Sequence, residues 1–127
     1  MKARILVIDD DPDIVEVLRA RLEANDYSVL SASDGEDGLI KIRQEAPDLV
    51  VLDIIMPRMD GFNLVKEIKA NKETRDIPII ILTAKDKMRD LFEMEGVSEY
   101  MVKPFKTEEL LEKIKSLLIK QKKIDEY

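Results

Sequence analysis

The chain contains no cysteine and no histidine. Without cysteine it has no disulfide bonds, no thiolate metal sites and no cysteine nucleophile. Without histidine it has no imidazole catalysis and no histidine-bound metal, so any metal ligands must be mainly oxygen atoms. Apolar stretches are also interrupted well short of the roughly 20 residues that a membrane-spanning helix needs. We therefore expect a cytoplasmic chain that does not enter a membrane.

The composition that remains is that of one acidic globular domain. The chain has 127 residues, of which 45% are hydrophobic and 38% are charged, and its formal net charge is −6. This length and apolar content suffice for one packed core. The negative charge disfavours direct binding of nucleic acid, because phosphate backbones repel it. We expect a single domain over residues 1–127, with no output domain attached.

Five short apolar runs, rich in β-branched residues and bounded by turn signals, predict β-strands. The predicted strands are Arg4–Ile8, Tyr27–Ala32, Leu49–Leu52, Pro78–Leu82 and Glu99–Val102. Runs such as LVVL (49–52) are apolar throughout and do not alternate. This pattern is typical of parallel strands that helices cover on both faces.

Amphipathic patterns between these runs predict five helices. Asp11 and Pro12 start the first helix, whose expected buried stripe comprises Ile14, Val17, Leu18 and Leu22. The other predicted features are a cap at Asp34 before Leu39, Ile42 and Ala46, a third helix after Gly61, a fourth near Asp86–Glu95, and a fifth after Thr107. Five βα units with right-handed crossovers give an α/β fold, a doubly wound three-layer sandwich around a parallel five-stranded sheet.

Polar residues with the chemistry of a ligand site follow four of the apolar runs: Asp9, Asp10, Asp53, Thr83 and Lys103. Parallel sheets bind ligands outside the carboxyl ends of their strands. Two carboxylates about 4 Å apart repel by roughly 4 kcal/mol at an effective dielectric of 20, which a bound cation offsets. An oxygen-only ligand set in an open pocket favours Mg²⁺. Metal, ammonium and hydroxyl around one carboxylate predict phosphoryl transfer with an aspartate as nucleophile.

Simpler interpretations exist for parts of this set. Acids favour the start of a helix, so Asp9, Asp10 and Asp11 can be read as a helix-start cluster. Three consecutive acids also leave open which two would hold a metal. We assign Asp9 and Asp10 to the metal, because Asp11 directly precedes Pro12 and suits an N-cap. Lys103 by itself is consistent with a surface lysine. A role in a site is favoured only because Asp53 is also present after another predicted strand.

Four stretches resemble the receiver domain of two-component response regulators, in particular its stand-alone, chemotaxis-Y-like form. They are ILVIDDDPDI (5–14), PDLVVLDIIMPRMDGF (47–62), IPIIILTAK (77–85) and YMVKPF (100–105). The resemblance extends over essentially the whole chain. It implies the flavodoxin-like strand order 2-1-3-4-5, which is the order given for this family in general descriptions of doubly wound folds.

The resemblance implies a metal site. Asp53 resembles the phosphoacceptor, and Asp10 resembles the direct Mg²⁺ ligand. Asp9 resembles the second acid, which acts largely through water. The backbone carbonyl of Ile55 resembles a further metal ligand. Mg²⁺ is therefore the expected cofactor, held by Asp9, Asp10, Asp53 and Ile55.

The resemblance also implies a conformational switch. Lys103 resembles the lysine that contacts the acceptor and then the phosphoryl group, and Thr83 resembles the switch hydroxyl that moves toward that group. Tyr100 stands where the family keeps an aromatic ring whose inward or outward rotamer follows that movement. Pro104 stands where a cis peptide is common. Thr83 and Lys103 are also closer together in sequence than is usual in the family, which predicts a shortened fourth helix or entry loop.

The implied function is signal transduction by a phosphoacceptor that catalyses only its own phosphorylation and dephosphorylation and is not a conventional enzyme. A sensor histidine kinase would phosphorylate Asp53, and the modified chain would control a protein target. The alternative is a phosphorelay intermediate that passes the phosphoryl group to a histidine phosphotransfer protein.

Overall fold

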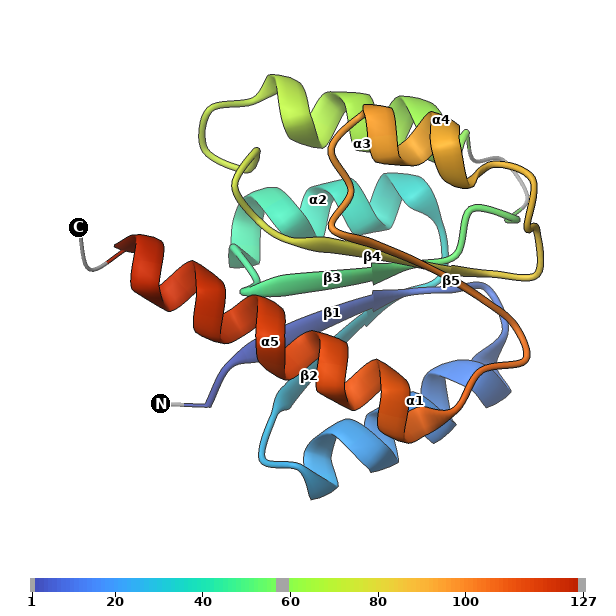
Figure 1. Ribbon diagram of the computed structural model, residues 1–127, viewed down its shortest axis with the longest axis vertical. Coiled ribbons are helices and arrows are strands. Elements are labelled where there is room, and N and C mark those ends of the chain that lie inside the picture. The colour runs from blue at the N-terminus through green and yellow to red at the C-terminus, as the bar shows by residue number, and fades with distance from the viewer. Residues whose placement is uncertain (1, 57–59, 126–127) are drawn as a thin grey trace.

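The computed structural model describes residues 2–56 and 60–125. Within them, strands and helices alternate along the chain (Figure 1). The strands are β1 (Arg4–Ile8), β2 (Ser28–Ala32), β3 (Leu49–Leu52), β4 (Ile79–Thr83) and β5 (Glu99–Val102). The helices are α1 (Pro12–Ala24), α2 (Gly35–Glu45), α3 (Gly61–Ala70), α4 (Arg89–Met94) and α5 (Thr107–Asp125).

The strands form one parallel sheet in the order β2-β1-β3-β4-β5. In Figure 1, α1 and α5 lie on one face of the sheet and α2, α3 and α4 lie on the other. The predicted α/β fold class, the doubly wound three-layer sandwich with order 2-1-3-4-5, is therefore confirmed. The central strands are buried on both faces, which explains why their sequences are apolar at every position.

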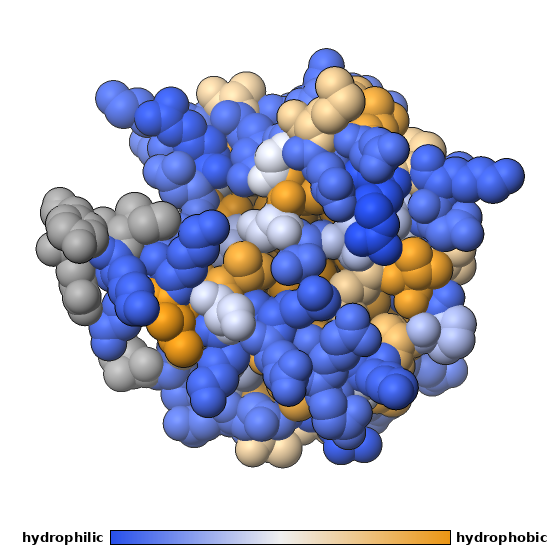
Figure 2. Space-filling view, viewed as in Figure 1, coloured by the Kyte–Doolittle hydropathy of each residue, from blue (hydrophilic) through white to orange (hydrophobic). Residues whose placement is uncertain are grey.

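The alternation of side chains along each strand divides the core into two layers. In β1, Ile5 and Val7 pack with α1 and α5, whereas Leu6 and Ile8 pack with the helices of the opposite face. All four side chains are almost fully buried. The outer surface is different, because Figure 2 shows mainly hydrophilic residues with hydrophobic patches between them.

Three aspartates start the helices that follow β1, β2 and β3. Asp11, Asp34 and Asp60 accept hydrogen bonds from backbone N–H groups in the first turns of α1, α2 and α3. Such caps satisfy donors that have no partner inside the helix. Each cap follows a strand directly or closely, so the helix starts gather at the same edge of the sheet as the strand ends.

Two predicted inward positions are wrong. Val17 is 55% exposed, because the buried stripe of α1 is centred on Leu18 and Leu22 and therefore extends to Val15 on the other side. Ala46 is exposed and has a left-handed backbone with φ 45°, and its N–H donates to the Ile42 carbonyl to end α2. It closes the helix instead of packing beneath it.

The element boundaries otherwise shift by small amounts. β2 and β4 each begin one residue later than predicted, at Ser28 and Ile79. The fourth helix is a short element of six residues, and its C-terminal loop turns at Gly96, where φ is 91°. A positive φ is a conformation that glycine adopts without steric cost. The last helix begins at Thr107 itself, whereas the sequence predicted Thr107 as the residue before it.

Candidate functional site

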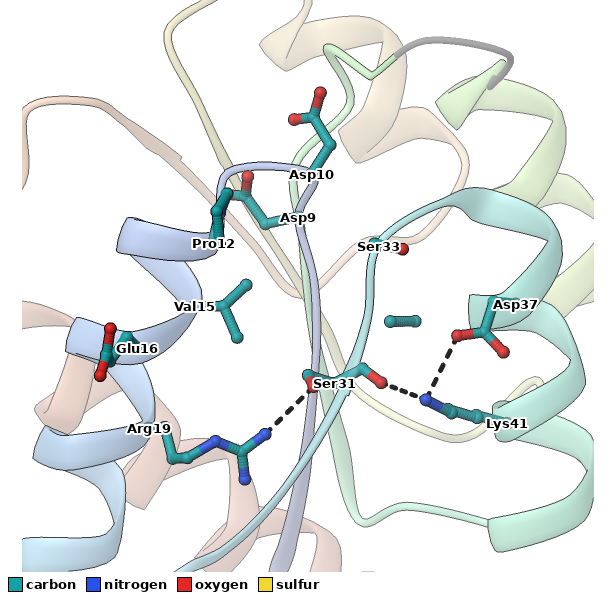
Figure 3. A pocket seen from close by; sticks show the side chains of 11 residues that line it. Asp9, Asp10, Pro12, Val15, Glu16, Arg19, Ser31, Ser33, Asp37 and Lys41 are labelled. Carbon is teal, nitrogen blue, oxygen red and sulfur yellow. Dashed lines mark hydrogen bonds and ion pairs between the residues drawn. The ribbon is translucent and has the colours of Figure 1, made fainter.

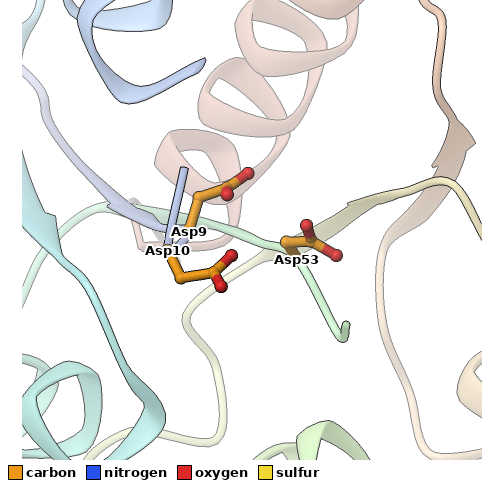
Figure 4. Close-up of side chains that lie close together, drawn as sticks. All are labelled: Asp9, Asp10 and Asp53. Carbon is orange, nitrogen blue, oxygen red and sulfur yellow. The ribbon is translucent and has the colours of Figure 1, made fainter. Parts of the chain in front are cut away.

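The acids of the predicted site meet at the C-terminal edge of the sheet. Asp9 and Asp10 directly follow β1, and Asp53 directly follows the neighbouring strand β3. The chain leaves β1 and β3 toward opposite faces, since α1 and α3 lie on different sides of the sheet. This change of side opens a crevice at the strand ends, where doubly wound folds bind ligands. Figure 4 shows Asp9 and Asp10 next to each other, with Asp53 beside them.

The three carboxylates are close enough to share one cation. Asp9, Asp10 and Asp53 each offer an oxygen atom, and these atoms lie within 4.8 Å of one another. Asp9 and Asp53 are buried, at 4% and 7% exposure, whereas Asp10 is exposed. One side of the cluster is therefore dry and fixed, and the other side is open to solvent and to an incoming group.

Lys103 completes the cluster from the end of β5. Its Nζ donates to Asp9 Oδ2 and to Asp53 Oδ2, both at 3.0 Å. The lysine side chain is 18% exposed, so these contacts are shielded from solvent. One ammonium against three carboxylates still leaves an excess of negative charge, which a divalent cation would neutralise.

Burial and charge act in opposite directions on the two buried partners. Burial raises the pKa of the Asp9 carboxyl, although the Asp11 N–H and the Lys103 ammonium oppose that rise. Burial alone would lower the pKa of Lys103, but its hydrogen bonds to Asp9 and Asp53 outweigh burial and hold it above the usual value. Lys103 therefore remains a cation at neutral pH, in a position to stabilise negative charge on Asp53.

Backbone N–H groups orient the two buried carboxylates. Asp9 Oδ1 accepts from the Asp11 N–H at 2.9 Å, and Asp53 Oδ1 accepts from the Ile55 N–H at 2.9 Å. Each acid thus has one oxygen fixed by the turn that follows it and the other directed to Lys103. Asp11 itself caps α1 through the Asp13 N–H, so its carboxylate does not belong to the cluster. The acids that meet at the strand ends are therefore Asp9, Asp10 and Asp53, while Asp11 caps a helix.

The predicted switch residues lie on the two neighbouring strands β4 and β5, where Thr83 ends β4 and Tyr100 is the second residue of β5. Thr83 is fully buried, and its Oγ1 accepts from the Lys85 N–H at 3.4 Å. Tyr100 is turned inward at 2% exposure, and its hydroxyl donates to the Lys85 carbonyl. Burial raises the pKa of the Tyr100 phenol, so it keeps the proton that this hydrogen bond needs. Both residues therefore contact Lys85 in the β4–α4 loop, Thr83 through the Lys85 N–H and Tyr100 through the Lys85 carbonyl.

The remaining predicted positions are distributed as follows. Ile55 is 48% exposed, and its N–H contacts Asp53. The peptide between Lys103 and Pro104 is cis, as predicted. Residues 57–59 of the turn after Asp53 lie outside the described residues.

A pocket of about 520 Å³ extends from Asp9 and Asp10 between α1 and α2 (Figure 3). At its base, Arg19 and Lys41 approach β2 from opposite sides of the sheet. The Arg19 guanidinium donates to the Val29 carbonyl and the Ser31 hydroxyl, both at 3.0 Å, and Lys41 donates to the Ser31 carbonyl. These contacts cover an edge strand, which would otherwise offer free carbonyls to another strand.

The donor set fits Mg²⁺. The clustered groups are carboxylate oxygens, of which two are prearranged by backbone N–H groups and one is exposed. Mg²⁺ prefers such hard oxygen ligands, and it keeps several waters when only one or two carboxylates hold it. The open side at Asp10 leaves room for those waters and for a phosphoryl oxygen.

One contributor was not found from the sequence. Arg89, the first residue of α4, donates to the Tyr100 carbonyl at 2.7 Å and lies over the Tyr100 ring. The sequence contains no local signal for this contact, because it joins two elements that only the fold brings together.

A doubly wound parallel sheet with an acidic crevice at its switch point defines a class of ligand-binding α/β domains. Comparison with known families identifies the protein family within this class. The model of the response regulator receiver domain matches residues 5–115. The chain therefore belongs to the receiver domain family of two-component response regulators. Receiver domains act as phosphoacceptor switches and interact with histidine kinases.

The chain is similar to proteins of two different lengths. It is 42% identical over 120 residues to the alkaline phosphatase synthesis transcriptional regulatory protein PhoP of Bacillus subtilis, covering 93% of this chain and 49% of PhoP. It is 41% identical over 118 residues to protein PilH of Pseudomonas aeruginosa, and this match covers 91% of this chain and 98% of PilH. The chain thus spans about half the length of the transcriptional regulators it resembles and nearly all of PilH.

A solved structure carries information on ligands. The response regulator protein TrrA of Thermotoga maritima, crystallised in complex with Mg²⁺ and BeF, is 42% identical, with a TM-score of 0.83. The match covers 92% of this chain and 99% of that one.

Within residues 2–56 and 60–125, no helix combines the length and apolar character needed to cross a bilayer.

Proposed function

We propose that Asp53 accepts a phosphoryl group from a sensor histidine kinase in a Mg²⁺-dependent reaction, and that the modified chain then controls a protein partner. One observation carries the proposal: the buried Asp53 carboxylate bonds to Lys103 at 3.0 Å and shares a cation-sized space with Asp9 and Asp10. A buried acid with both an ammonium and two further acids around it has little structural purpose, because replacing such charges with apolar groups is often neutral or stabilising.

The transfer forms one bond and breaks one. A carboxylate oxygen of Asp53 attacks the phosphorus of the kinase's phosphohistidine, the P–N bond breaks, and an acyl phosphate remains on Asp53. Lys103 is placed to pair with the negative oxygens of the incoming group, since its ammonium already contacts Asp53. Asp9, Asp10 and Asp53 would hold Mg²⁺, which would supply positive charge to neutralise the remaining charge of the phosphoryl oxygens.

The chain cannot supply its own phosphohistidine, because it contains no histidine. The phosphohistidine therefore lies outside residues 1–127, and we propose a cytoplasmic location, where a kinase has access to ATP. Residues 1–127 would act together as one receiver domain. For the output, we favour a protein target over nucleic acid, since the net charge is −6. A phosphorelay role would instead appear as rapid transfer from Asp53 to a second histidine-containing protein.

The test uses acetyl phosphate as a small-molecule donor with Mg²⁺, followed by mass spectrometry of the intact chain. We expect one added phosphoryl group in the parent and none in Asp53→Asn. Asp86→Asn is a matched control, because Asp86 is an exposed acid on the β4–α4 loop. Undiminished labelling of Asp53→Asn, or equal loss in both variants, would overturn the assignment.

A further inference from the structure

Arg89 connects the start of α4 to the outer edge of the sheet. β5 is the last strand in the order β2-β1-β3-β4-β5, so one side of its backbone has no neighbouring strand. Arg89 Nη1 donates to the Tyr100 carbonyl at 2.7 Å and so provides that edge with a charged donor. Hydrogen bonds from a guanidinium are stronger than those from neutral groups. The contact therefore holds the first turn of α4 against β5.

The same guanidinium covers the Tyr100 ring. Its central carbon lies 5.2 Å from the ring centroid, while Phe92 packs against the ring from inside the core with centroids 6.1 Å apart. Tyr100 is 2% exposed, whereas the Arg89 side chain is 46% exposed. Arg89 thus lies between the ring and solvent at the open edge of β5. A ring that swung outward would have to displace it.

A continuous set of contacts joins this ring to the switch hydroxyl. The Tyr100 hydroxyl donates to the Lys85 carbonyl, and the Lys85 N–H donates to Thr83 Oγ1 at 3.4 Å. Because Thr83 acts as acceptor there, its own hydrogen remains free to be donated to an oxygen atom near Asp53. The inward ring therefore holds the carbonyl of Lys85, and the N–H of the same residue orients Thr83.

We infer that Arg89 is a positioning residue for the phosphoryl site: by holding the Tyr100 ring inward, it keeps Lys85 and Thr83 in the arrangement that receives a phosphoryl group. This inference rests on the proposed function of Asp53. Arg89 does not touch the acids, so it acts through Tyr100 and not on the metal.

The Arg89 contact changes the affinity for a phosphoryl group only if it is stronger in the arrangement that receives this group than in the arrangement with the ring outward. The cation–π contact is made with the ring in its inward position, and an outward movement of the ring would change its 5.2 Å distance to the guanidinium. Such contacts and charged hydrogen bonds at partly exposed sites are modest, so we expect removal of Arg89 to weaken binding of a phosphoryl mimic about three- to tenfold.

The test compares Arg89→Met with Lys87→Met. Both variants remove one positive charge from the same segment, but Lys87 is exposed and makes no hydrogen bond or ion pair among the described residues. Titrations give the affinity for Mg²⁺ alone and then for beryllofluoride at saturating Mg²⁺. We expect Arg89→Met to keep the affinity for Mg²⁺ and lose affinity for beryllofluoride, with partial recovery in Arg89→Lys. Lys87→Met should match the parent in both titrations.

A second measurement reports on the ring directly. The chain has three tyrosines and no tryptophan, so Tyr27→Phe and Tyr127→Phe leave Tyr100 as the only strong fluorophore. In that background, Arg89→Met should increase quenching of Tyr100 by acrylamide. Unchanged quenching together with unchanged beryllofluoride affinity overturns this role of Arg89 while leaving the proposed function intact. If the parent fails to bind beryllofluoride at Asp53, the proposed function fails, and the quenching still decides whether Arg89 retains the ring.

Discussion

Replacing Asp10 with Asn separates the electrostatic cost of the acidic cluster from its capacity to bind Mg²⁺. The substitution preserves side-chain size and removes one of three carboxylates whose oxygens lie within 4.8 Å of one another. At that distance a pair of like charges repels by about 3.5 kcal/mol at an effective dielectric of 20 and by about 0.9 kcal/mol in bulk water. Asp10 is exposed, so the lower value applies to each of its pairs.

Asp10 forms two such pairs, so we expect Asp10→Asn without metal to be more stable than the parent by about 1–2 kcal/mol. Mg²⁺ should have the opposite effect. At a concentration of about 100 times its dissociation constant, a ligand raises the free energy of unfolding by about 2.7 kcal/mol. Mutation of a residue that only hydrogen-bonds to a metal ligand typically lowers the affinity for the metal 10- to 100-fold, and Asp10 is itself a proposed ligand. A thirtyfold loss in Asp10→Asn would reduce the same gain to about 0.9 kcal/mol.

The assay is urea unfolding followed by circular dichroism, with and without Mg²⁺, together with direct titration of the metal. Asp13→Asn is the matched control, because it also removes one exposed acid from the start of α1 but lies outside the cluster. It should neither gain stability in the apo form nor lose Mg²⁺. If Asp10→Asn binds Mg²⁺ as tightly as the parent, the metal site is not the cluster formed by Asp9, Asp10 and Asp53.

Three further outcomes follow from individual contacts. Without Mg²⁺, Lys103→Met should lower the free energy of unfolding by about 3 kcal/mol, because it leaves two buried carboxylates without their cation. Urea unfolding measures this change, and a stability equal to that of the parent would contradict it. Ile55→Asn should shorten the lifetime of the phosphorylated form, since Ile55 is exposed two residues after Asp53 and its apolar side chain offers water no polar contact. Decay of the labelled protein measures this lifetime, and an unchanged rate would show that Ile55 does not control access. Gly61→Ala should destabilise the fold by about 1–3 kcal/mol, because an added Cβ would lie 2.8 Å from the Ile54 side chain and 3.1 Å from its backbone; thermal unfolding equal to that of the parent would refute it.

Local signals in the sequence were sufficient for the elements and for the identity of the acids. LVVL (49–52) is apolar at every position and forms β3, and Asp11 before Pro12 caps α1. These signals act through backbone groups and neighbours only a few residues away, so no tertiary contact is needed to interpret them. The order of Asp53, Thr83 and Lys103 after their strands also predicted a shared edge, because parallel strands end on the same side.

The tertiary structure decided which atoms meet. Asp9 and Lys103 are 94 positions apart, and only the strand order brings their side chains to 3.0 Å. Val17 fits the apolar pattern of its helix, yet it is exposed because the sheet contacts a different side of α1. The contact between Arg89 and Tyr100 has no counterpart in any local pattern. Periodicity defines which residues can share a face, but the packing of distant elements determines which neighbours that face finds.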